Sequence, residues 1–132
     1  MILTVYKNLA SIAKIEFTDI VVVTNIIFTP THRAQKLRIY LIDSSFIDIW
    51  LTLDGRYSYH WHSLDSFIYR HDNAPHERWD FISTFPKHCH DGSEKNVIDS
   101  DIPDNYEEGI RFFLQKVRDK MKIENRGHTT FS

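Results

Sequence analysis

The stretch Lys36–Asp72, KLRIYLIDSSFIDIWLTLDGRYSYHWHSLDSFIYRHD, decides the fold of this 132-residue chain. Side chains alternate along it, with Leu37, Ile39 and Leu41 on one side of an extended segment. Alternation with a period of two is the pattern of a half-buried strand. Short turn sequences such as DSS separate the alternating runs, and short turns join antiparallel neighbours. The stretch therefore predicts an antiparallel meander.

Asp54-Gly55 gives the strongest turn signal in this meander. The pair is typical of a two-residue hairpin loop in which both positions have positive φ. We expect it to join the run before it to a strand over Arg56–His62. Ile20–Phe28 is dense in β-branched residues and Phe67–His71 follows another turn, so the sheet should have about five strands.

A helix is predicted at each end of the chain. Residues 2–14 place apolar side chains near one side of a helix, and a cleaner apolar stripe follows Pro103. That stripe contains Tyr106, Ile110, Phe113, Leu114, Val117 and Met121. We predict one α+β domain over residues 1–132. One helix precedes the sheet in the sequence, and the other follows the sheet and packs on it. Residues 124–132 are predicted to form a flexible tail.

Composition narrows the class of protein. Sixteen basic and eighteen acidic residues leave a net charge of −2, whereas a general nucleic-acid binder is usually basic. Cys89 is the one cysteine, which excludes an internal disulfide and a multi-cysteine zinc site. The N-terminus lacks signal-peptide features, and the run IVVVTNIIF is shorter than the ~20 residues that span a bilayer. These features predict a cytoplasmic protein without a membrane segment.

Six of the eight histidines lie between His60 and His90. On a strand over Arg56–His62, His60 and His62 share a face, and Arg70 and Asp72 share a face on the next strand. The stretch that follows, up to residue 99, reads as rich in loops. If it folds back over the sheet, its histidines and Arg70 meet in one cleft.

The first interpretation of this cluster is acid–base chemistry on RNA without a metal. Cleavage needs a base for the ribose 2′-OH, an acid for the leaving oxygen and a cation for the developing charge. Histidine titrates near neutral pH, so we assign acid–base roles to His76, His88 and His90. Asp72 would orient one histidine, and Arg70 would bind phosphate. Trp61, Trp79 or a tyrosine would hold a base by stacking.

Two other interpretations stay open. A zinc or similar ion could be held by His60 with His62, or by His88 with His90, because the spacing His-x-His on a strand points both imidazoles the same way. The histidines could also be structural and bind backbone groups. Cys89 would point away from its two histidine neighbours on an extended segment, which argues against a nucleophile.

Three segments carry a resemblance to a known family. RYSYHW (56–61), YRHDNAPH (69–76) and FPKHCH (85–90) precede a helix introduced by an acidic segment with proline. This order resembles the TumE-type toxins of prokaryotic toxin–antitoxin systems. The resemblance implies a small α+β toxin that acts on RNA and is neutralised by an antitoxin encoded beside it. It adds His60, Trp61 and Asn73 to the candidate substrate-binding residues.

We therefore expect a toxin, with metal-independent RNA cleavage as the mechanism to test and no required cofactor. Its partners would be a cognate antitoxin and an RNA substrate, and the sequence is compatible with a homodimer. The alternative is a non-catalytic binding or regulatory module whose histidines are structural or hold a metal.

Overall fold

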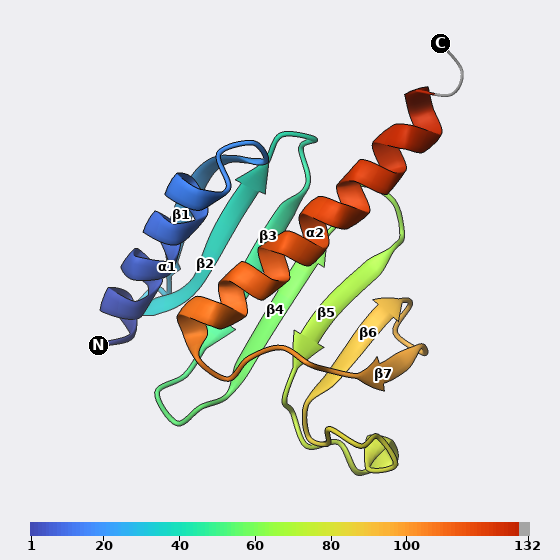
Figure 1. Cartoon of the computed structure of the whole chain (residues 1–132). Coiled ribbons are helices and arrows are strands. Elements are labelled where there is room, and N and C mark those ends of the chain that lie inside the picture. The colour runs from blue at the N-terminus through green and yellow to red at the C-terminus, as the bar shows by residue number, and fades with distance from the viewer. Residues whose placement is uncertain (130–132) are drawn as a thin grey trace.

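An antiparallel sheet of seven strands forms the frame of the molecule in the computed structural model, which describes residues 1–129 (Figure 1). Each strand pairs with the next one along the chain, so the predicted meander is confirmed. The strands are β1 (Val21–Phe28), β2 (Ala34–Leu41), β3 (Phe46–Leu51), β4 (Tyr57–His62), β5 (Ile68–Asp72), β6 (His88–Gly92) and β7 (Val97–Asp99).

Both helices lie on the same face of this sheet (Figure 1). α1 (Ile2–Glu16) packs on β1 and β2, and α2 (Tyr106–Thr129) crosses the sheet and contacts β4 and α1. The apolar stripe predicted for the second helix supplies much of the core, with Ile110, Phe113, Leu114, Val117 and Met121 all buried. The α+β class is confirmed. Neither helix in residues 1–129 is long and apolar enough to cross a membrane.

Strand β4 shows how the alternation separates core from solvent. Tyr57, Tyr59 and Trp61 are buried in the hydrophobic core that both helices cover. His60 and His62 alternate with them along the strand and are half-buried on the opposite face. The histidines of β4 therefore lie on the face of the sheet that these two helices leave uncovered.

Two strands, β6 and β7, lie where a loop was predicted, which raises the number from about five to seven. β6 has the sequence HCHDG, which lacks the β-branched and aromatic residues that favour strands. Backbone pairing with β5 and β7 forms the strand instead. His88 and His90 consequently belong to the sheet, whereas we had expected them to fold over it. The loop is residues 73–87, with a short 3-10 helix, η1 (Glu77–Trp79).

The hairpin between β3 and β4 has a three-residue loop in place of the two residues predicted. The Thr52 N–H donates to the Arg56 carbonyl (3.0 Å), so Leu53–Gly55 lie outside the ladder. Gly55 has φ of 94°, but Asp54 is not in the positive-φ region. Asp54-Gly55 therefore marked the position of the turn correctly, but the predicted two-residue turn type was wrong.

The second helix begins with a side-chain cap. The Glu108 N–H donates to Asn105 Oδ1 (3.0 Å), which satisfies an N–H group of the first turn. The helix continues to Thr129 and so extends into the predicted tail over residues 124–132. Residues 130–132 lie outside the described residues.

Gly109 lies where α2 comes very close to the sheet. A Cβ there would be 2.6 Å from the Tyr59 hydroxyl oxygen and 3.2 Å from the Pro103 carbonyl oxygen. Tyr59 is 1% exposed, so its ring has no room to move aside. We expect Gly109→Ala to lower the free energy of unfolding by about 1–3 kcal/mol, the usual cost of overpacking, although alanine is the better helix former.

A double-mutant cycle with Tyr59→Phe tests this contact. The Tyr59 hydroxyl is buried and has no hydrogen-bond partner within the described residues, so removing it should cost little by itself and should relieve the clash. Urea denaturation of the four proteins would show a smaller loss for Gly109→Ala in the Tyr59→Phe background. Equal losses in both backgrounds would contradict the proposed contact.

Candidate functional site

Strands β5 and β6 bring the predicted site residues together on the uncovered face of the sheet. Arg70 lies opposite His90 in the strand pairing, and Asp72 lies opposite His88. The two imidazole rings are neighbours, with centroids 5.0 Å apart. Cys89 points the other way into the core, and burial raises the pKa of its thiol to about 12, so it is no nucleophile.

His88 is held between a carboxylate and a backbone carbonyl. Its Nε2 lies 3.1 Å from Asp72 Oδ1, and its Nδ1 lies 3.0 Å from the Pro86 carbonyl oxygen. Burial opposes a charge on the ring, but Asp72 and the carbonyl outweigh it and raise the pKa of His88. Burial likewise opposes charge on Asp72, yet His88 and the Ala74 N–H lower its pKa to about 2. Asp72 is thus placed as an orienting group for His88.

His90 has a different environment. Its Nδ1 lies 3.0 Å from the Glu94 carbonyl oxygen, and the side chain is 0% exposed. Burial and the nearby Arg70 charge lower the pKa of His90, so the neutral form is favoured. The Nε2 atom is buried and has no hydrogen-bond partner in the part of the chain that the structure describes. The two histidines therefore differ in charge preference although they are two residues apart.

Arg70 is clamped by two carboxylates. Its Nε donates to Asp72 Oδ2 (3.0 Å), and its two terminal nitrogens donate to the Glu94 oxygens (2.8 and 3.1 Å). Sequence reasoning missed Glu94, because it lies in a hairpin turn that was not predicted. The sequence feature that could have located Glu94 is its position four residues after His90, which fits a hairpin turn after a strand.

Trp79 covers the histidines from the loop between β5 and β6. Its ring centroid lies 4.6 Å from that of His88 and 4.9 Å from that of His90. His76 is exposed at the rim, with its ring against Trp79 and 6.4 Å from His88. The third predicted acid–base histidine is therefore outside the buried pair.

His60 borders the site, across the β4–β5 ladder from Arg70. Its ring stacks on His62 with a centroid distance of 3.9 Å. Burial, with the His62 and Arg70 charges, lowers the pKa of His60 to about 4, so the ring is neutral at pH 7. The neutral imidazole of His60 therefore lines one side of the site.

Asn73 and Trp61, two predicted substrate-binding residues, have structural positions. Asn73 Oδ1 accepts from the Tyr57 N–H (3.0 Å) and its amide donates to the Gly55 carbonyl (2.8 Å), which ties β5 to the neighbouring hairpin. Trp61 is 0% exposed in the core, and its Nε1–H donates to Ser45 Oγ (3.0 Å). A buried ring has no free face for a base, so this arrangement gives no support to base stacking by Trp61.

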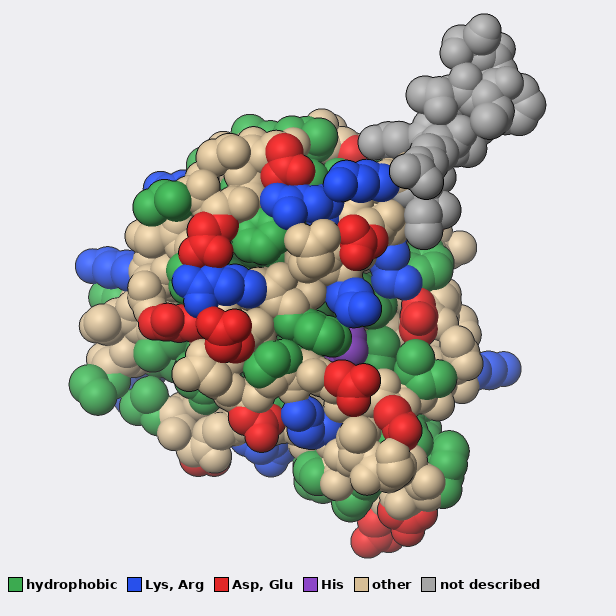
Figure 2. All heavy atoms as spheres, viewed as in Figure 1, with side chains coloured by type: hydrophobic (Ala, Val, Ile, Leu, Met, Phe, Trp, Pro, Cys, Tyr) green, Lys and Arg blue, Asp and Glu red, His purple; other side chains and the backbone are tan. Residues whose placement is uncertain are grey.

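The helix-covered face has a different character. Figure 2 shows Lys and Arg interleaved with Asp and Glu on this face, and no continuous basic field. Arg111 pairs with Glu16 (2.9 Å) and Arg118 with Asp19 (2.7 Å), so charges there neutralise one another. This pattern fits a solvated surface and not a track for RNA.

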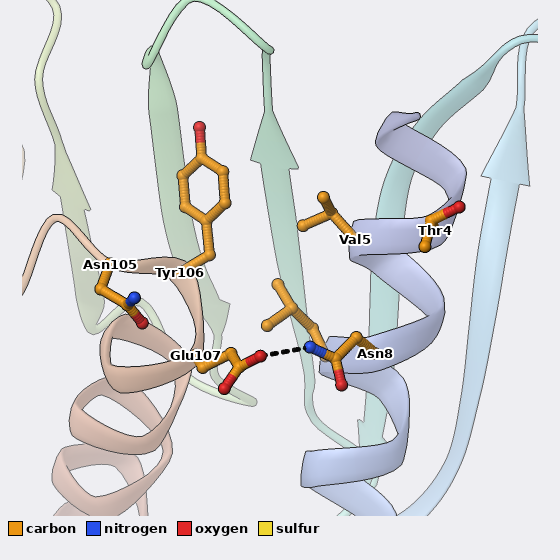
Figure 3. Close-up of a pocket in the computed structure, with 7 residues that line it drawn as sticks. Thr4, Val5, Asn8, Asn105, Tyr106 and Glu107 are labelled. Carbon is orange, nitrogen blue, oxygen red and sulfur yellow. Dashed lines mark hydrogen bonds between the residues drawn. The ribbon is translucent and has the colours of Figure 1, made fainter.

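A hollow of about 330 Å³ lies between the two helices (Figure 3). Asn8 from α1 donates to Glu107 from α2 across it (2.6 Å). Its other lining residues are Thr4, Val5, Leu9, Asn105 and Tyr106. None of these is a predicted site residue, and the hollow is on the helix side of the sheet. The histidine site is therefore the better candidate for chemistry.

The histidine site also has the donors of a metal centre. Asp72, His88 and His90 each offer one ligand atom, and these atoms lie within 4.8 Å of one another. Within the part of the chain that the structure describes, His60 and His62 belong to no such group of three. Of the two histidine pairs predicted for a metal, the β6 pair therefore has the third ligand.

Comparison with known proteins agrees with the resemblance. A family model described as "Toxin TumE" matches residues 10–121, which include every strand, the C-terminal part of α1 and most of α2. No curated protein and no solved structure matches the chain. Since the family match covers most of the sequence, the chain belongs to the TumE family of toxins, the toxin components of toxin–antitoxin systems.

Proposed function

We propose that this toxin cleaves RNA at His88 and His90 by acid–base chemistry. The observation that carries the proposal is a buried pair of imidazoles in different surroundings. Asp72 lies 3.1 Å from His88 Nε2 and favours a charged ring, whereas burial and Arg70 favour a neutral His90, although Glu94 Oε2 lies 3.5 Å from its Nδ1. A carboxylate favours a protonated ring, which can act as an acid, and a cation favours a neutral ring, which can act as a base.

The chemistry follows from these assignments. His90 Nε2 takes the proton of a ribose 2′-OH while the 2′ oxygen forms a bond to phosphorus. The bond from phosphorus to the 5′ oxygen breaks, and His88 Nε2 gives that oxygen its proton. The products are a 2′,3′-cyclic phosphate and a free 5′-OH. Asp72 orients His88 and stabilises its charged form.

Two neighbours have to move for RNA to reach the imidazoles. Trp79 covers both rings and lies on a short loop helix, so displacement of this loop opens the site and frees the indole to stack on a base. Glu94 is exposed, so a phosphate group can replace its carboxylate on the Arg70 fork. His76 is at the rim, where it would contact the entering strand.

RNA is the proposed substrate, and the antitoxin that the family implies is the proposed protein partner. A homodimer is a further expectation, which light scattering of the purified protein tests. Cleavage itself is tested with untagged protein, total RNA and a chelator. Full-length RNA should disappear, and new 3′ ends should carry a cyclic phosphate. Intact RNA at every protein concentration would favour a non-catalytic binding module.

Arg70→Lys and Glu94→Gln should change cleavage in opposite directions. Lysine keeps the charge but loses the planar fork, so we expect Arg70→Lys to lose up to about 10²–10³ of the rate, the cost of losing a transition-state donor. Glu94→Gln removes a competing carboxylate and leaves the carbonyl that binds His90 in place. Cleavage rates of the two purified variants, compared with the parent, give the result. Equal losses would mean that the Arg70–Glu94 pair is structural.

A further inference from the structure

The tautomers of His88 and His90 are fixed by their backbone partners. Each Nδ1 lies 3.0 Å from a carbonyl oxygen, that of Pro86 for His88 and that of Glu94 for His90. A carbonyl can only accept, so each Nδ1 carries the hydrogen. In the neutral rings, both Nε2 atoms therefore present lone pairs, which is the arrangement found in metal-binding histidines.

Both Nε2 atoms are buried and lack hydrogen-bond partners among the described residues. The His88 Nε2 atom is 3.1 Å from Asp72 Oδ1, but this contact does not have hydrogen-bond geometry. A lone pair at this distance from a carboxylate oxygen is repelled, so a positive species is needed between them. A proton on His88 is one solution, and a metal ion that also reaches His90 is another.

The carboxylate is already oriented for a ligand. Arg70 Nε holds Asp72 Oδ2 (3.0 Å), and the Ala74 N–H donates to Oδ1 (3.1 Å). Such supporting hydrogen bonds fix metal ligands in known sites. Glu94 binds the remaining Arg70 donors and offsets the arginine charge next to the site. When both histidines are neutral, the net charge of the site is −1, from Arg70, Asp72 and Glu94.

The geometry points to a site for one first-row transition ion, zinc above all, bound by Asp72 Oδ1, His88 Nε2 and His90 Nε2. Two imidazoles and one carboxylate suit zinc, whereas magnesium and calcium prefer oxygen ligands. Three protein ligands leave a fourth position open. In a second step, which rests on the proposed function, the ion blocks cleavage because it occupies both Nε2 atoms, so His90 cannot accept a proton there and His88 cannot carry one.

Zinc binding is measured first, without reference to activity. Untagged full-length protein, stripped with a chelator, is titrated with Zn²⁺ by calorimetry, and with Co²⁺ by visible absorption, which reports tetrahedral coordination. We expect one ion per chain. Asp72→Asn and His90→Asn should weaken binding by more than about 100-fold, since even changes to the groups that support metal ligands cost 10–100-fold. His62→Ala, a histidine of the same sheet face, should bind zinc like the parent.

His90→Asn is chosen because its amide can still donate to the Glu94 carbonyl, so the fold is kept while Nε2 is lost. Absence of binding to the parent protein, or equal binding by all three variants, would overturn the site. Binding that survives while RNA stays intact under every condition would refute the proposed function and leave the metal site standing.

The second step is tested with RNA. Adding one equivalent of Zn²⁺ to the stripped protein should suppress cleavage by at least tenfold, and a chelator should restore it. Magnesium at the same concentration should have no effect. If cleavage required zinc, both the proposed inhibition by zinc and the metal-free mechanism would be wrong. The binding data would still support the zinc site.

Discussion

Bacteria that express the His88→Ala or the His90→Ala variant should grow normally, whereas the parent chain should arrest growth and degrade cellular RNA. Loss of a general acid or base typically removes ~10²–10⁴ of the rate. Both rings have their Nε2 atoms buried together beside Asp72 and Arg70, so neither can be replaced by a neighbour or by bulk water. Growth curves and total-RNA gels measure the two effects.

The matched control is His62→Ala, which removes an imidazole from the same sheet face, two strands away from β6. It should remain toxic. Circular dichroism melts of all three variants separate loss of chemistry from loss of fold, because His88 and His90 are themselves buried. If His88→Ala and His90→Ala were folded and fully toxic, the catalytic assignment would be wrong and the pair would be structural.

The sequence predicted the sheet where side chains alternate between apolar and polar. It failed at β6, where the alternation is between two histidines and a cysteine, and no hydropathy difference marks the faces. Backbone pairing with β5, a non-local interaction, decides that segment. The same pairing brings His88 to Asp72 and His90 to Arg70. The sequence therefore identified the candidate residues, but it did not predict which of them lie opposite one another in the sheet.

Glu94 and Trp79 show a second limit of sequence reasoning. Glu94 reaches Arg70 from a hairpin turn, and Trp79 reaches His88 from a loop of fifteen residues, 73–87. Neither contact has a periodic signal, because loop conformation depends on tertiary packing. Local turn chemistry identifies where a loop lies, and it does not say which strand the loop covers.

Trp61 is a residue for which two arguments from the sequence disagree. The resemblance carried by RYSYHW makes Trp61 a candidate substrate-binding residue. Strand alternation, however, places it with Tyr57 and Tyr59 on the core face. The structure agrees with the period of two, because the Trp61 ring is 0% exposed.

The position of Trp61 gives the second large prediction. Trp61→Ala should lower the free energy of unfolding by about 3–5 kcal/mol, the usual cost of deleting a large buried aromatic side chain. Small domains are stable by only about 5–15 kcal/mol, so the variant should be largely unfolded at growth temperature or close to it. It should lose toxicity together with its near-ultraviolet circular dichroism signal.

Trp61→Phe distinguishes a core role from an RNA-binding role. Phenylalanine keeps most of the apolar volume and loses the bond to Ser45, whose hydroxyl still donates to Asp43. The loss of one buried hydrogen bond costs about 1 kcal/mol, which a folded domain tolerates. Since a fully buried ring cannot contact RNA, we expect this variant to cleave RNA at the parent rate. A folded Trp61→Phe protein without activity would mean that the indole acts in the site, and that the closed arrangement of the sheet opens during function.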